Sequence, residues 1–226
     1  MAEKSLVREY LEALLIAVVF ATFARTWVVQ AFKIPSGSME PSLLIGDHIL
    51  VNKFLYGPVL HPLERALLPM REVDRGDVVV FKYPKEEDRE RDFIKRCVGL
   101  PGDQVRLQDQ ELFINGATRD ESGYAYYTDT AGIYRRARQG FGPTTVPAAS
   151  FFCLGDNRDN SNDSRYWGPV PATHVKGRAF MIYWSFHSEP SNGEWLGWQN
   201  KLGQLGKVAR NFFSMTRWER TFRVVR

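Results

Sequence analysis

Short apolar runs separated by turn signals fill most of this chain beyond Phe32. The runs are rich in the β-branched and aromatic residues that favour strands, and the segments between them carry Gly, Pro, Asn and Asp. An Asn-Gly pair at residues 115–116, between two such runs, is a strong hairpin signal. The pattern predicts a mainly β protein with antiparallel strands, with strand-like runs at residues 49–51, 78–81, 93–94, 105–107, 111–114, 151–154 and 179–184.

The segment from residue 14 to residue 24 is uncharged and almost wholly apolar. A membrane span needs about 20 residues, and a helix over residues 11–32 reaches that length if its few charged side chains extend toward the lipid headgroups. A cleavable signal peptide is the alternative, with a small-x-small cleavage site at residues 22–24. Because Glu9 and Glu12 are unusual ahead of such a site, we expect an uncleaved single transmembrane helix over residues 11–32.

Composition excludes several classes of protein. Charged residues make up 25% of the chain, too large a share for a protein that crosses a membrane many times. No His/Cys spacing indicates a metal site and no Gly-rich loop indicates a nucleotide, so we expect neither a metal nor a cofactor. The net charge of +4 is compatible with nucleic-acid binding, but no binding motif accompanies it, so we expect no nucleic-acid partner. Cys97 and Cys153 lie in apolar runs, where buried free thiols are the default and a disulfide in an oxidising compartment is the alternative.

The sequence IPSGSMEPSL, residues 34–43, places Ser38 in a turn bounded by Gly and Pro. Gly37 bends the backbone without a Cβ clash, and Pro35 and Pro41 restrict φ on either side. A serine in such a turn can present its hydroxyl outward while backbone N–H groups face the same point. An ordinary Ser/Gly/Pro linker is the alternative, and this segment alone does not separate the two.

Three further segments complete a set of four motifs. They are RGDVVVFKYP (75–84), RDFIKRCVGLPGD (91–103) and GDNRDNSNDSRYWG (155–168). Together the four resemble bacterial type I signal peptidase, the membrane-bound serine protease family that removes signal peptides from exported proteins. The resemblance runs from about Phe32 to Phe186, with the motifs in the family's order. In that family a lysine, and not a histidine, activates the serine nucleophile.

The resemblance implies a role for each matching residue. Ser38 falls on the nucleophile and Lys95 on the general base. Ser36 falls on the hydroxyl that completes the oxyanion hole with the Ser38 backbone N–H, and Ser161 falls on the serine that orients the lysine amine. Supporting roles near the site fall on Asp156, Arg158, Asp163 and Arg165, and the last two are expected to form an ion pair.

A lysine base must be neutral, although the reference pKa of lysine is about 10.4. Burial disfavours the ammonium and can lower that pKa by several units, into the range useful near neutral pH. Lys95 lies in an apolar strand-like run, where alternation sends Lys95 and Arg96 to opposite faces. We expect Lys95 to enter a pocket while Arg96 is solvated. Without the family resemblance, a solvated surface lysine would be the ordinary interpretation.

A histidine triad is the competing way to activate a serine. The chain has four histidines, His48, His61, His174 and His187, and none lies in a recognisable catalytic setting. The G-x-S-x-G motif of one large class of serine hydrolases is also absent from the sequence. We therefore reject a histidine-based mechanism.

The resemblance also implies two shallow apolar pockets, which accept small residues at the −1 and −3 positions of the exported precursor. The first pocket would be lined by Ile34, Pro35, Met39, Leu43, Phe93 and Ile94. The second would be lined by Ile34, Ile94, Phe32, Ile49 and Val80. Each of these residues would also be an ordinary core residue of a β domain. Phe93 replaces the tyrosine of some relatives, a change that should be tolerated.

The family's organisation implies how the chain is divided. We expect a cytoplasmic N-terminus (1–10), a transmembrane helix (11–32), a catalytic core in two parts (33–103 and 151–190), an inserted β subdomain (104–150) and a basic C-terminal tail (191–226). The tail is suited either to anionic lipid or to solvent. We expect a monomeric, single-pass protein of the bacterial inner (cytoplasmic) membrane, with its catalytic domain on the extracytoplasmic side. Its expected partners are membrane lipid and the signal peptides of exported preproteins.

Three alternative functions remain after the first choice, a signal peptidase I. A processing peptidase dedicated to one secretion or conjugation substrate would carry the same motifs. A self-cleaving Ser/Lys repressor would need a DNA-binding helix-turn-helix before the β domain, where this chain has an apolar segment. An inactive, membrane-anchored peptide-binding module would not need all of Ser38, Lys95 and Ser161.

Overall fold

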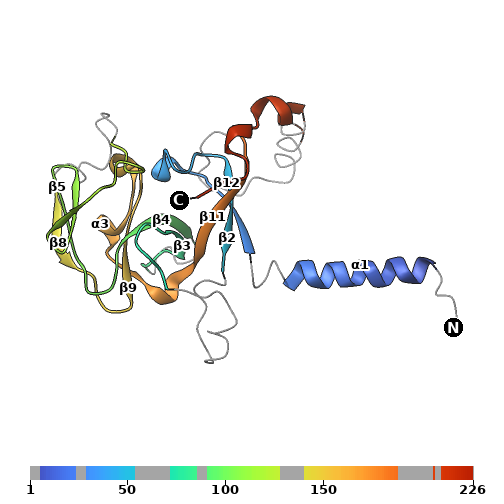
Figure 1. The fold of residues 1–226 in the computed structure, drawn as a ribbon, viewed down its shortest axis with the longest axis horizontal. Helices are drawn as coiled ribbons and strands as arrows, with labels where there is room; N and C mark the ends of the chain where they lie inside the picture. Colours follow the sequence, from blue (N-terminus) through green and yellow to red (C-terminus); the bar gives the residue numbers. More distant parts are fainter. Residues whose placement is uncertain are drawn as a thin grey trace.

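The computed structural model describes residues 6–23, 29–53, 72–85, 91–127, 140–187, 206 and 210–225. Antiparallel strands dominate it, as the sequence pattern predicted, and one long helix, α1 (Leu6–Phe23), extends away from them (Figure 1). The strands are β1 (Val29–Lys33), β2 (Asp47–Asn52), β3 (Val78–Lys82), β4 (Asp92–Gly99), β5 (Gln104–Gln108), β6 (Glu111–Ile114), β7 (Ala117–Arg119), β8 (Phe141–Thr145), β9 (Ser150–Leu154), β10 (Val170–Pro171), β11 (Val175–Ser185) and β12 (Arg223–Val224).

The larger sheet has the strand order β1-β2-β11-β3-β4-β9-β10, and β12 pairs with β11 outside this path. Strand β11 links its two halves because it pairs with both β2 and β3. Its register shifts three times, between residues 175 and 177, 179 and 181, and 182 and 184. Such irregularities bend a strand and increase its twist. They accompany the curved path of β11 across the domain in Figure 1.

The smaller sheet has the order β7-β6-β5-β8 and is built from residues 104–145, within the range expected for an inserted subdomain. Asn115 and Gly116 join β6 to β7 and both have positive φ, of 54° and 82°. A two-residue turn of this kind matches the twist of a hairpin, so the predicted Asn-Gly hairpin is confirmed. Asp109 and Gln110 make the same kind of turn between β5 and β6, without an equally clear sequence signal.

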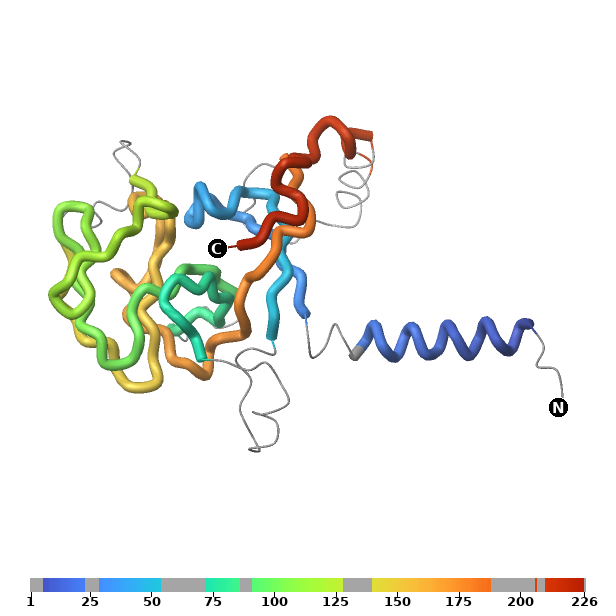
Figure 2. The backbone as a smooth tube through the Cα atoms, in the orientation of Figure 1, coloured from blue at the N-terminus to red at the C-terminus, as the bar shows by residue number. Residues whose placement is uncertain are grey.

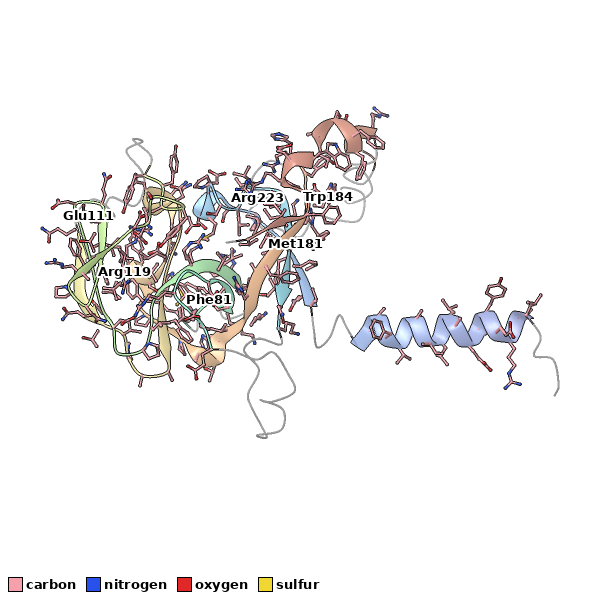
Figure 3. All side chains as sticks on the ribbon, in the orientation of Figure 1. Phe81, Glu111, Arg119, Met181, Trp184 and Arg223 are labelled. Atoms are coloured by element: carbon pink, nitrogen blue, oxygen red, sulfur yellow. The ribbon has the colours of Figure 1, made fainter. Side chains whose placement is uncertain are left out.

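Strand β3 lies between two cores, which explains its continuous apolar sequence. Val78 and Val80 belong to a cluster that also contains Ile34, Met39 and Ile49. The alternating residues, Val79 and Phe81, belong to a second cluster with Cys97, Cys153, Trp167 and Val170. Figure 3 labels Phe81 inside the domain. A strand buried on both faces has no solvent-facing positions, so it loses the polar alternation of a surface strand.

The expected helix over residues 11–32 is wrong in its limits. The helix covers Leu6–Phe23, and residues 29–33 form β1, which pairs with β2 from Val29↔Asn52 to Lys33↔His48. Hydrogen bonding to β2 gives this segment an extended partner, which explains why the helix does not continue through it. Figure 2 shows α1 leading away from the β domain. No helix within the described ranges combines the length and apolar character needed to cross a membrane.

The C-terminal segment, for which contact with anionic lipid and a solvated tail were both open, is docked on the domain through the buried residues Thr216, Arg220 and Val225. Strand β12 pairs with β11 at Met181 and Ile182, and Val225 is buried in the same cluster as Ile34. Figure 3 shows Arg223 beside Met181 and Trp184 at this junction. Burial of Val225 and the pairing of β12 hold this part of the chain on the domain. Residues 191–205, 207–209 and 226 of the expected tail lie outside the described residues.

Candidate active site

Ser38 lies in the short 3₁₀ helix η2 (Gly37–Met39), within the connection from β1 to β2. The connection is closed by two backbone hydrogen bonds, from the Ile34 N–H to the Asp47 carbonyl at 2.8 Å and from the Gly46 N–H to the Ile34 carbonyl at 2.9 Å. The side chains of Ile34 and Met39 enter the core on either side of the serine. The turn is therefore held on the sheet and does not behave as a linker.

Lys95 comes from β4 and meets Ser38 across 57 residues of sequence. Its amine lies 2.7 Å from the Ser38 hydroxyl oxygen and donates a second hydrogen bond to the Ile94 carbonyl at 2.8 Å. Lys95 is 3% exposed. Burial lowers the pKa of Lys95 from 10.5 to about 8, against the smaller opposing effects of the Asp163 and Asp156 carboxylates. The structure thus joins a buried amine of depressed pKa to a serine hydroxyl.

Arg96 points away from Lys95, as strand alternation predicted, but the expectation that it would be solvated is wrong. It is 2% exposed and makes two hydrogen bonds to the Asp156 carboxylate, at 2.8 and 2.7 Å. Its guanidinium also donates to the Gly76 carbonyl and lies 4.2 Å from the centroid of the Tyr124 ring. A buried arginine needs such partners because an unpaired buried charge is strongly unfavourable. Asp156 forms a buried ion pair with Arg96, and its expected supporting role at the site stays a prediction.

The loop after β9 carries the predicted ion pair between Asp163 and Arg165. The two side chains make paired contacts of 2.8 Å and both are buried. Asp163 also accepts a hydrogen bond from the Gly155 N–H at 3.0 Å and from the Arg165 N–H at 3.2 Å, where it caps the short helix α3 (Ser164–Trp167). This carboxylate therefore closes the loop on itself, and its expected supporting role at the site stays a prediction.

Ser161 is fully buried in the same loop. Its hydroxyl has no hydrogen-bond partner among the described residues, and the Lys95 amine bonds instead to the Ser38 hydroxyl and the Ile94 carbonyl. A Cβ at Gly155 would lie 2.2 Å from the Ser161 hydroxyl and 2.5 Å from the Ser38 carbonyl oxygen. Only a glycine allows the loop to pack this closely against the nucleophile turn. The expected role of Ser161 toward the lysine stays a prediction.

Ser36 caps η2 with extended backbone, at φ −134° and ψ 157°. Its side chain makes no capping hydrogen bond and is exposed. The hydroxyl two residues before Ser38 is therefore not engaged in holding the helix. Its expected role in an oxyanion hole stays a prediction.

Most of the residues expected to line the substrate pockets gather in one cluster beside η2. Five of them are at most 2% exposed and are core residues, namely Ile34, Met39, Leu43, Ile49 and Val80. Phe32 and Ile94 pack against the same cluster and keep some exposed surface, and Pro35 is exposed. Phe93 packs in the other cluster, stacked on Tyr83 with ring centroids 4.9 Å apart, and its ring centroid lies 5.7 Å from the Lys95 amine.

The cysteines and the described histidines play no visible part at Ser38. Cys97 and Cys153 are neighbours on β4 and β9, and both are free and buried, as the default interpretation predicted. Burial raises the pKa of the Cys153 thiol. His48 packs against the rings of Tyr183 and Trp184, away from the serine. His61 lies outside the described residues.

Sequence reasoning missed one buried acidic residue close to the site. Glu121, in the inserted subdomain, pairs with Arg158 of the loop after β9 through two contacts of 2.6 Å. The arginine was expected to support the site, but its partner was not identified. A single glutamate in a turn-rich stretch, 37 residues before the arginine, carries no local signal of such a pairing.

The sequence profile described as "Signal peptidase, peptidase S26" matches residues 7–184. The chain belongs to this family. It is therefore a serine endopeptidase of the signal peptidase family. The profile spans all four motifs, including the residues that bring Ser38 and Lys95 together.

Curated relatives in this signal peptidase family agree with the assignment. "Signal peptidase I" of Pseudomonas aeruginosa is 39% identical over 192 residues, which cover 72% of this chain and 67% of the relative. "Probable signal peptidase I-2" of Synechocystis is 39% identical over 171 residues, covering 74% and 69%. "Signal peptidase I" of Aquifex aeolicus is 33% identical over 230 residues, covering 79% and 84%. A crystal structure of a signal peptidase I from Enterococcus faecalis is 33% identical and has a TM-score of 0.38, covering 48% of this chain and 97% of that one.

Proposed function

We propose that this enzyme removes signal peptides from exported preproteins, with Ser38 as nucleophile and Lys95 as general base. The observation that carries the proposal is the 2.7 Å contact between the buried Lys95 amine and the Ser38 hydroxyl. A pKa of about 8 leaves a useful fraction of the amine neutral near physiological pH. A merely structural lysine would be expected to pair with a carboxylate, whereas this amine bonds to a hydroxyl and a backbone carbonyl.

In the proposed reaction the neutral Lys95 amine takes the Ser38 hydroxyl proton while the serine oxygen attacks the carbonyl carbon of the scissile peptide bond. The tetrahedral intermediate collapses when the Lys95 ammonium gives that proton to the leaving amine, and the signal peptide stays attached to Ser38 as an ester. Water then attacks the ester with Lys95 again as base, which frees the peptide and restores the serine. The hydrogen bond to the Ile94 carbonyl helps to aim the amine through these steps.

Two serines would complete the machinery. The unpartnered hydroxyl of Ser161 supports a role as acceptor for a second N–H of the neutral amine, which would fix the amine's orientation. The uncapped hydroxyl of Ser36, together with the Ser38 backbone N–H, would donate to the oxyanion of the tetrahedral intermediate. Both groups are polar, close in sequence or space to Ser38, and free of competing hydrogen bonds among the described residues.

The proposed substrates carry small residues at positions −1 and −3 before the cleaved bond. The support is the apolar cluster that contains the core residues Ile34 and Val80, against which the partly exposed Phe32 and Ile94 pack. An apolar surface built from these side chains would suit small apolar residues of the substrate. A peptidase dedicated to a single secretion or conjugation substrate would use the same surface and remains the second candidate.

We also propose that the enzyme works at the bacterial inner membrane, on the extracytoplasmic side where preproteins emerge. The support is exposed apolar surface, which associates with lipid when it is large and continuous. Leu14, Ile16 and Phe20 of α1 are each more than 60% exposed, and Phe213 and Phe222 of the C-terminal segment are 80% and 71% exposed. A contact of both surfaces with lipid would keep the enzyme beside membrane-bound precursors.

The proposal is tested by incubating the purified protein in detergent with several unrelated exported preproteins. We expect cleavage of each after a small residue, with the new N-terminus identified by sequencing, and no cleavage by the Ser38→Ala variant. Cleavage of a single preprotein among many would favour the dedicated peptidase. Failure to cleave any would refute the proposal.

A further inference from the structure

The inserted subdomain reaches the active-site loop through residues 121–127. The Tyr126 N–H donates to the Asp156 carbonyl at 2.7 Å, and the Arg158 N–H donates to the Tyr126 carbonyl at 2.8 Å. These bonds place Tyr126 beside Asn157 as an isolated parallel bridge. The subdomain therefore adds a short strand-like support to the loop that carries the buried charges of the site.

A buried ion pair fixes this support in place. Two Arg158 guanidinium nitrogens each lie 2.6 Å from a different Glu121 carboxylate oxygen, and the side chains are 0% and 7% exposed. The same guanidinium donates to the Gly155 carbonyl at 3.1 Å. Burial acts to lower the pKa of Arg158, but the hydrogen bonds and charge of Glu121 more than offset this and raise it. Paired geometry of this kind is the strongest arrangement of an arginine and a carboxylate.

The supported loop in turn contacts the backbone of the nucleophile. The Asn157 N–H donates to the Ser38 carbonyl at 3.2 Å, and the Asn157 side chain donates to the Gly37 carbonyl at 3.3 Å. Gly155 approaches the Ser38 carbonyl so closely that an added Cβ would lie 2.5 Å from it. A shift of this loop would therefore also displace the backbone of Ser38.

We propose that Glu121 is a positioning residue for cleavage, because it holds Arg158 and, through residues 155–158, the backbone of Ser38. Glu121 bonds to Arg158 and Tyr124 and not to Ser38 or Lys95, so its effect is indirect. The inference rests on the proposed function, because positioning is measured as a rate of cleavage.

Substituting Glu121→Gln keeps the shape of the side chain but leaves the Arg158 guanidinium buried without its carboxylate. The loop should relax toward solvent, and a displacement of about 1 Å at a catalytic group can cost up to 10²-fold in rate. We expect kcat to fall about 10-fold, with KM changed less than about twofold, since the apolar cluster proposed to contact the substrate is untouched. Water admitted beside Lys95 should relieve the burial that depresses its pKa, so the alkaline rise in rate should move to higher pH.

The experiment compares Glu121→Gln, Glu121→Asp and the matched control Glu111→Gln with the full-length wild type. Glu111 is an exposed carboxylate on β6 of the same subdomain. Thermal unfolding first identifies a temperature at which every variant is folded. Rates of preprotein cleavage are then measured against substrate concentration and pH, and amide hydrogen exchange is followed in peptides covering residues 151–163. Glu121→Asp keeps the charge and should retain more of kcat than Glu121→Gln, and Glu111→Gln should behave as wild type.

A Glu121→Gln enzyme with wild-type kcat and pH profile would overturn the inference, even if its unfolding temperature had fallen. A loss of kcat without faster exchange in residues 151–163 would overturn it also, because the effect would not pass through the loop. If the wild type cleaves no preprotein, the proposed function fails by itself. Hydrogen exchange then still tests whether Glu121 holds the loop at residues 155–158. Faster exchange in residues 151–163 of the Glu121→Gln variant, but not of Glu111→Gln, supports this, and unchanged exchange refutes it.

Discussion

The rate of cleavage should follow the neutral fraction of Lys95, and the structure sets where that fraction changes. With a pKa of about 8, roughly a tenth of the amine is neutral at pH 7 and roughly nine tenths at pH 9. Since the neutral form is the base, kcat/KM should rise about 10-fold between these values and level off above pH 9. A lysine with the ordinary pKa of 10.5 would instead give a rise of about 100-fold over the same interval, without levelling.

The assay measures kcat/KM from pH 6 to 11 with a synthetic peptide that spans a signal-peptide cleavage site. Constant ionic strength keeps charge screening equal across the series, and circular dichroism confirms that the fold persists at each pH. The Lys95→Arg variant is the control and should be inactive throughout, because a guanidinium is not deprotonated in this range. A wild-type rate that keeps climbing to about pH 10.5 would show that burial does not depress the pKa of Lys95, and the proposed mechanism would need replacement.

Further expectations concern the catalytic pair, the oxyanion, the C-terminal segment and the membrane. Ser38→Ala and Lys95→Ala should each abolish cleavage, and the double variant should lose little more, because the residues act as a unit; substantial turnover by either single variant would contradict the assignment. Ser36→Ala should lower kcat about 10²–10³-fold with little change in KM, while Ser36→Thr keeps a hydrogen-bond donor and much of the rate. A wild-type kcat in Ser36→Ala would show that backbone N–H groups alone stabilise the oxyanion. Arg220 contacts the fully buried Asp47 at 2.6 Å, so Arg220→Ala should lower the free energy of unfolding by about 3–5 kcal/mol in a denaturant titration, and Arg223→Ala, on an exposed residue, should not. The full-length protein should stay with membranes in carbonate, and a form lacking residues 1–28, which keeps β1 whole, should be released yet still cleave peptides. Release of the full-length protein would count against lipid attachment.

The sequence was a good guide wherever structure depends on near neighbours. The Asn115-Gly116 hairpin formed as predicted because only small or polar residues adopt positive φ readily. The run at residues 78–81 formed β3 because its β-branched and aromatic side chains suit a strand buried on both faces. The limits of the N-terminal helix were less predictable. Residues 29–32 could by composition continue the helix or form a strand. They form a strand because they pair with β2, about 20 residues later in the chain.

The four ordered motifs were enough to identify the family and to predict that Ser38 and Lys95 meet, as they do at 2.7 Å. Which charged residues are buried, and with which partners, follows from the three-dimensional fold. Arg96 and Asp156 are separated by 60 residues, Glu121 and Arg158 by 37, and Asp47 and Arg220 by 173. The identity of a charged residue in the sequence does not show whether its side chain is solvated or buried. Its environment depends on which distant segment folds against it, and for the same reason the pKa of Lys95 is a property of the fold and not of its neighbours in the chain.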